Sequence, residues 1–128
     1  MLTAVHLLIY SDDPEATRSF LREVLDLAYV EHVESAPGWL IFKTGPSELG
    51  VHPTSGTYEG ESFSHPRQHS IALMCDDIEA TKTELEMKGA EFTGTIEDMG
   101  FGLALMLRVP GAEDILLYEP RHPAAYNL

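Results

Sequence analysis

The hydrophobic and polar positions of this chain repeat one order of elements in each half. In the first half, residues 4–10 are apolar apart from His6, which predicts a largely buried strand. The tripeptide Asp-Asp-Pro follows at residues 12–14, and this combination of caps and proline is typical of a helix start. Apolar residues then recur at helical spacing over residues 16–27, so we expect a helix with one apolar stripe.

Three short strands are expected after this helix. They are separated by Pro-Gly and Gly-Pro pairs, which break regular structure, and they cover residues 28–33, 39–44 and 48–52. Residues 53–67 are polar, rich in Gly, Ser and Pro, and lack periodicity. A stretch of this kind is usually a lid, a binding loop or a linker, so we expect an irregular loop here.

The second half shows the same order. A strand is expected at residues 70–75, and the helix after it begins at an Asp-Asp pair and ends at a Lys-Gly pair. Three more strands are expected at residues 91–96, 102–109 and 115–119, followed by an irregular tail. Each half is therefore a strand, a helix and three strands.

A direct repeat supports this division. Residues 11–17 read Ser-Asp-Asp-Pro-Glu-Ala-Thr and residues 75–81 read Cys-Asp-Asp-Ile-Glu-Ala-Thr, half the chain length apart. Such self-similarity is weighed before other signals because it sets the architecture. One such unit leaves one face of its sheet bare, and two units can curve around a shared cavity.

We therefore predict an α+β fold in which two βαβββ modules in tandem form a curved mixed sheet around a central cavity. Three strands after each helix argue against the ferredoxin-like order. The chain of 128 residues suffices for one domain. Its parts are a first module at residues 1–53, a linker loop at 54–68, a second module at 69–120 and a tail at 121–128.

Composition excludes several classes of partner. Lys and Arg number 8 against 21 Asp and Glu, so the formal charge is −13. This charge repels nucleic acid and anionic membranes, and no stretch is apolar enough to span a bilayer. The single cysteine, Cys75, fits a reducing compartment, and we expect a cytoplasmic protein. Cys75 precedes a helix start, where it is either a buried structural thiol or a nucleophile with a lowered pKa.

Four pieces of sequence, in a fixed order, carry a resemblance to a known family. They are His6 with the following Ser11-Asp12-Asp13, the helix at residues 20–27, the repeated Asp76-Asp77-Ile78, and the ending from Pro110-Gly111 through residues 115–120. On these pieces the chain resembles the vicinal oxygen chelate superfamily, which holds glyoxalase I, bleomycin-resistance proteins, fosfomycin-resistance proteins and extradiol dioxygenases. The resemblance covers nearly the whole chain and implies the doubled fold predicted above.

The resemblance also implies a possible metal centre. Enzymes of this superfamily typically hold one divalent ion (Fe, Mn, Ni, Co or Zn) with ligands from the first and last strands of each half, and such a set polarises vicinal oxygens or activates dioxygen. A scan for ligand types gives one alternative set, namely His6, His52, His69 and Glu119.

Strand register argues against this set in the second half. His6 lies seven residues before Asp13, which is the spacing that the family uses, but the matching position before Asp77 is Ser70. His69 is one residue early, and a slip of one turns a strand side chain to the opposite face. Only a local bulge would restore it.

The last strand of the second half gives a similar result. Metal-binding members carry a Glu where this chain has Leu116, and Glu119 falls on the other face. Glu48 is the plausible match in the first half. Because His6 and Glu48 alone are too few for a catalytic divalent ion, we favour no cofactor.

The favoured function is a small-molecule-binding protein that lacks the usual metal centre, similar to the bleomycin-resistance proteins and, by that resemblance, a homodimer. The expected ligand-binding residues are His6, Tyr10, Trp39, Glu48, Ser70, Met106, Leu116 and Tyr118. The first alternative is a divalent-metal-dependent lyase, isomerase or dioxygenase using His6, His69 or His52 and a carboxylate. The second is a metal-free enzyme with His6 and Glu48 as an acid–base pair. His122 is expected at the surface.

Overall fold

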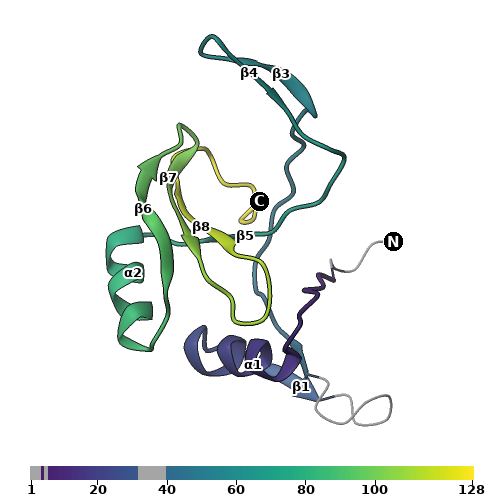
Figure 1. Cartoon of the computed structure of the whole chain (residues 1–128), viewed down its shortest axis with the longest axis vertical. Helices are drawn as coiled ribbons and strands as arrows, with labels where there is room; N and C mark the ends of the chain where they lie inside the picture. The colour runs from purple at the N-terminus through teal and green to yellow at the C-terminus, as the bar shows by residue number, and fades with distance from the viewer. Residues whose placement is uncertain (1–3, 5, 32–39) are drawn as a thin grey trace.

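The computed structural model describes residues 4, 6–31 and 40–128, and its architecture is α+β (Figure 1). Its helices and strands are α1 (Pro14–Ser19), the π-helical turn η1 (Phe20–Val24), β1 (Tyr29–Glu31), β2 (Leu40–Phe42), β3 (Ser55–Tyr58), β4 (Glu61–Ser64), β5 (Ala72–Met74), α2 (Ile78–Met87), β6 (Phe92–Asp98), β7 (Gly102–Leu107) and β8 (Ile115–Pro120). No helix among the described residues is both long and apolar enough to cross a bilayer.

The second half forms the complete βαβββ unit that the sequence predicts. Its four strands are ordered β5-β8-β7-β6, with β5 parallel to β8 and the other pairs antiparallel. The crossover from β5 through α2 leaves the helix on one face of this sheet, while the C-terminal tail runs past the other face (Figure 1). The α+β prediction is confirmed.

The core lies between this sheet and the two helices. Leu107 and Leu117 face the helices and are 0% and 3% exposed, and they pack with Leu85 of α2 and Phe20 of the first half. Burying each such side chain contributes roughly 1.5–3 kcal/mol. The core therefore joins the first helix to the second module.

Helix α2 begins and ends where the sequence predicts. The carboxylate of Asp77 accepts a hydrogen bond from the Ala80 N–H at 3.1 Å, which satisfies one of the free donors of the first turn. At the other end Gly89 takes a φ of +94°, and its N–H donates to the Glu86 carbonyl at 3.0 Å. A glycine adopts this left-handed conformation at little cost, so it ends the helix.

The loop between β7 and β8 joins the two modules. The Asp12 N–H donates to the Gly111 carbonyl at 2.7 Å, and the buried Thr17 hydroxyl donates to the Pro110 carbonyl. Gly111 has no room for a side chain, because a Cβ there would lie 2.6 Å from the Ser11 hydroxyl oxygen. The second module is thus fastened to the start of α1.

The first module differs from the prediction at its first and last strands. Residues 4 and 6–10 form no strand, and Tyr10 is 88% exposed; residues 48–52 form none either, and Val51 is 96% exposed. A strand needs a hydrogen-bonded neighbour and an apolar surface to cover it. Neither segment has such a neighbour among the described residues, so the two strand predictions are wrong for the single chain.

The middle strands of the first module are present as the antiparallel pair β1–β2, inside the predicted ranges. Trp39, which is one of the expected ligand-binding residues, lies outside the described residues together with residues 32–38. The placement of Trp39 stays a prediction.

The stretch expected to be an irregular loop contains a hairpin instead. Strands β3 and β4 pair from Ser55 opposite Ser64 to Tyr58 opposite Glu61. The two residues between them, Glu59 and Gly60, take φ values of 50° and 80°. Two left-handed residues make the tight turn that suits the twist of a hairpin. The sequence prediction missed it because a Glu-Gly pair is a weaker turn signal than Asn-Gly or Asp-Gly.

We expect Gly111→Ala to lower the free energy of unfolding by about 1–3 kcal/mol more than Gly89→Ala does. Both glycines have left-handed φ values, +81° and +94°, but a Cβ at position 89 meets nothing within 4 Å. The comparison therefore isolates the close approach of the β7–β8 loop to the start of α1. Urea unfolding followed by circular dichroism measures both costs, and equal costs would contradict the inferred joint.

Candidate functional site

The face of the four-stranded sheet opposite α2 carries several of the expected ligand-binding residues. Met106 on β7 lies opposite Leu116 on β8, and Ala104 lies opposite Tyr118. Their neighbours Leu107 and Leu117 point into the core, so strand alternation turns this set to the other face. Met106 and Leu116 are half-buried. We call Met106, Leu116 and Tyr118 the tail face, because the C-terminal tail runs past it and contacts Tyr118.

A hydrogen-bonded group lies at the edge of the tail face. The Tyr118 hydroxyl is 3.0 Å from Nε2 of His122, and Oε1 of Glu48 is 3.7 Å from the same nitrogen. The second carboxylate oxygen of Glu48 accepts a hydrogen bond from the Ala125 N–H at 2.7 Å. Only 17% of the Glu48 side chain is exposed. We call Glu48, Tyr118 and His122 the Glu48 cluster.

The hydrogen bonds of the Glu48 cluster fix which atoms donate. Nδ1 of His122 lies 2.8 Å from the Pro123 carbonyl, which can only accept, so Nδ1 carries a proton. In the neutral imidazole Nε2 is then an acceptor, and the Tyr118 hydroxyl donates to it.

The surroundings of Tyr118 keep its hydroxyl protonated. Burial, and secondly the negative charge of Glu48, raise the pKa of the Tyr118 hydroxyl above its ordinary value. Its ring meets Phe101 edge to face, with centroids 5.3 Å apart. Tyr118 can therefore act as a hydrogen-bond donor and an aromatic surface near neutral pH, and it is poorly suited to react as a phenolate.

The expected ligand-binding residues divide into two groups. One group belongs to the tail face: Met106, Leu116 and Tyr118 form it, and Glu48 lies at its edge. Ser70 is exposed ahead of β5, and His6 and Tyr10 are exposed in the N-terminal segment. No contact among the described residues joins His6 to Glu48, whose partner is His122. The structure therefore offers His122, and not His6, as the imidazole beside Glu48.

The alternative metal ligands do not fit a shared ion. Oε1 of Glu119 accepts a hydrogen bond from the Ile78 N–H at 3.1 Å, so this carboxylate caps α2 on the helix side of the sheet. The His52 ring packs instead against Phe63 and His65, at centroid distances of 5.3 and 5.8 Å. Across residues 4, 6–31 and 40–128, no three His, Cys, Asp or Glu residues gather closely enough to hold a metal.

Cys75 has the environment of a structural thiol. It is half-buried, and its Sγ donates to the Tyr118 carbonyl at 3.6 Å. Burial is the main cause that raises the pKa of the Cys75 thiol. A thiol that stays protonated near neutral pH is a poor nucleophile. This favours the structural one of the two readings of Cys75.

His122 is the site residue whose contacts sequence reasoning missed. Its side chain is 32% exposed and belongs to the Glu48 cluster, whereas we expected only a surface position. One signal was available, because His122 comes only four residues after Tyr118 and the intervening chain has little freedom around Pro120. The path of the tail back toward Glu48 is a long-range contact and leaves no local sequence pattern.

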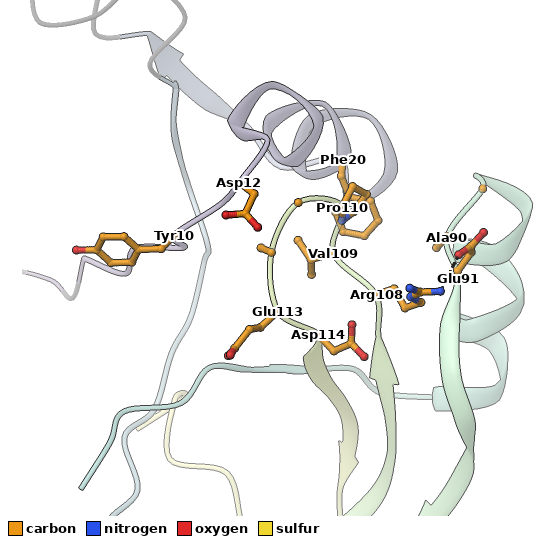
Figure 2. A pocket seen from close by; sticks show the side chains of 13 residues that line it. Tyr10, Asp12, Phe20, Ala90, Glu91, Arg108, Val109, Pro110, Glu113 and Asp114 are labelled. Atoms are coloured by element: carbon orange, nitrogen blue, oxygen red, sulfur yellow. Dashed lines mark hydrogen bonds and ion pairs between the residues drawn. The ribbon is translucent and has the colours of Figure 1, made fainter. Parts of the chain in front are cut away.

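A separate hollow of about 700 Å³ lies beside the joint between the modules (Figure 2). Asp12, Glu113 and Asp114 surround it, and Arg108 at its rim is paired with Glu91 at 3.4 Å. Among the described residues that are not exposed, no buried side-chain nitrogen or oxygen lacks a hydrogen-bond partner. The carboxylates around the hollow are exposed to solvent, so we place the candidate site at the tail face.

The doubled sequence pattern and the helix-backed sheet define a domain of the glyoxalase type. The family model described as Glyoxalase/Bleomycin resistance protein/Dioxygenase superfamily matches residues 3–114, and the chain belongs to this superfamily. No characterised protein sequence matches the chain significantly.

Solved structures share the fold at low sequence identity. TnmS3, an antibiotic binding protein from Streptomyces sp. CB03234, is 18% identical with a TM-score of 0.61, and the match covers 93% of this chain and 97% of that chain. Lactoylglutathione lyase from Agrobacterium tumefaciens is 19% identical with a TM-score of 0.58, covering 92% and 94%. A superfamily member from Sphaerobacter thermophilus DSM 20745 is 20% identical with a TM-score of 0.55, covering 92% and 98%.

We expect Tyr118→Phe to remove an alkaline component from the ultraviolet titration of the tyrosines. Because the pKa of Tyr118 is raised on folding, its contribution to stability is fully present below the unfolded value of about 10. That contribution is lost as the pH rises through the folded pKa, so Tyr118→Phe should reduce the loss of stability above about pH 10. Tyr126→Phe, in the exposed tail, is the control. An unchanged alkaline titration in Tyr118→Phe would contradict the described environment.

Proposed function

We propose that this protein binds a small organic molecule on the tail face and releases it unchanged. The observation that carries the proposal is the pairing of an apolar surface, Met106 and Leu116, with a largely buried carboxylate, Glu48, at its edge. Binding sites combine apolar surface with a few convergent polar groups in this way. The phenol of Tyr118 adds a fixed donor and an aromatic ring.

The donor set separates this proposal from a metal-dependent enzyme. The fold is shared with an antibiotic binding protein and with a lactoylglutathione lyase, so the fold alone decides nothing. Glu119 is engaged as a helix cap and Leu116 stands on the tail face, which leaves no carboxylate from β8 for a metal. We therefore propose binding without a resident metal, with antibiotic-like compounds as the first ligands to test.

We also propose that the protein is a homodimer and, from its single cysteine, that it is cytoplasmic. Apolar side chains are exposed in the two segments that were expected to be strands, Leu7 and Leu8 at 50% and 54% and Leu49 and Val51 above 90%. Exposed apolar surface of this kind marks an interaction site. A second copy would supply the strand neighbours and the cover that one chain lacks.

We expect some compounds of an antibiotic collection to raise the melting temperature, with EDTA making no difference. Met106→Gln should weaken this effect because it places an amide on the tail face. Met87→Gln is the matched control, since Met87 is 84% exposed on α2. Mass spectrometry of the recovered compound should show it unchanged. Turnover, or metal copurified at one ion per chain with a melting temperature that falls in EDTA, would favour the enzyme alternatives instead.

We expect sedimentation equilibrium to give twice the chain mass of 14.2 kDa. Val51→Glu should shift the protein toward the monomer, because a charge would replace an apolar contact in the proposed interface. Met87→Glu adds the same charge on the exposed face of α2 and should leave the dimer intact. A wild-type protein that sediments as a monomer at micromolar concentration would refute the dimer.

A further inference from the structure

The C-terminal tail, residues 121–128, is held beside the tail face by several contacts. At its start the Arg121 N–H donates to the Phe101 carbonyl at 2.8 Å, and the Arg121 guanidinium lies 2.6 Å from Asp98. Further along, His122 contacts Tyr118, and the Ala125 N–H reaches Glu48. The tail thus has a firm attachment at the end of β8 and a second attachment on a residue from the other half of the chain.

The second attachment places a backbone N–H and an imidazole ring around one carboxylate. Oε2 of Glu48 accepts the Ala125 N–H at 2.7 Å, while Oε1 faces the imidazole of His122 at 3.7 Å. A carboxylate that is largely removed from water needs such donors, since an unsatisfied one is costly. If the tail moves away, Glu48 requires other donors in the same two places.

An aromatic contact accompanies these nitrogen donors. The rings of His122 and Tyr118 have centroids 5.8 Å apart and planes inclined by 39°, and Phe101 also meets the Tyr118 ring, edge to face. A flat, nitrogen-containing ring therefore lies beside Tyr118 with a nitrogen toward Glu48. Offset and tilted arrangements of this kind are favourable between ring systems.

We infer that the tail is an internal stand-in for the ligand, and that the ligand is a flat aromatic cation whose N–H groups take the places of the Ala125 N–H and of the His122 imidazole beside Glu48. This inference rests on the binding role proposed above and gives it a ligand class. The formal charge of −13 favours the approach of a cation over that of an anion. The ligand has to displace the tail, so the tail lowers the apparent affinity of the site.

The test compares two three-ring probes of similar shape and opposite charge, the cation 9-aminoacridine and the anion anthracene-9-carboxylate. Fluorescence titrations at pH 7.5 use the full chain. We expect the wild type to bind the cation more tightly than the anion, and Glu48→Gln to remove this preference. His122→Ala, which also removes a tail contact, is the second variant if Glu48→Gln does not fold.

The tail is tested with Ala125→Pro, which removes the N–H that Glu48 accepts. We expect it to tighten 9-aminoacridine binding by about tenfold, the ratio that corresponds to one hydrogen bond to a charged group. Asn127→Pro makes the same change two residues along, where no hydrogen bond of the N–H is found among the described residues, and should bind like the wild type. Equal or tighter binding of the anion, no binding of the cation, or no gain in Ala125→Pro would overturn the inference.

Met106→Gln separates the failure of this inference from the failure of the proposed function. If Met106→Gln weakens probe binding while Ala125→Pro changes nothing, the tail face binds ligands and only the role of the tail is wrong. If a probe binds equally well to Met106→Gln and to the wild type, the tail face is not the site, and both the proposed function and the inference fail.

Discussion

The attachment of the β7–β8 loop to the start of α1 is the contact on which the arrangement of the two modules depends. Two backbone carbonyls of that loop accept hydrogen bonds from Asp12 and Thr17, and Gly111 lets the two segments approach. The attachment points Phe20 into the core of the second module. Because the described part of the first module has only the short β1–β2 pair of its own, this joint and the shared core hold its helix in place.

The two halves differ in how well local sequence signals predict their helices and strands. The second module was predicted almost element by element, because its helix has strong start and stop signals and its strands find one another within about fifty residues of chain. The first module carries the same signals at residues 4–10 and 48–52, yet residues 4, 6–10 and 48–52 form no strand. A strand needs a neighbouring strand to pair with as well as a suitable composition. The described residues of one chain do not provide that neighbour for these two segments.

The candidate site was predictable to the same extent. Strand alternation alone indicated that Leu116 and Tyr118 lie on one face and Glu119 on the other, because the side-chain period of a strand is two. His122 could not be assigned in this way. Its position depends on where the tail turns back, and that is decided by its contact with Glu48, 74 residues earlier in the chain (122 minus 48).

The covalent link between the tail and β8 has a consequence for how this protein can change over evolutionary time. A tethered segment presents itself to the sheet at a high effective concentration, which depends on the length and stiffness of the connecting chain. Substitutions in the last few residues can therefore retune the occupancy of the tail face without altering any residue of the core. Ligand affinity then depends on residues of the tail and folding stability on residues of the core. Substitutions can therefore change one of the two properties while the other is conserved.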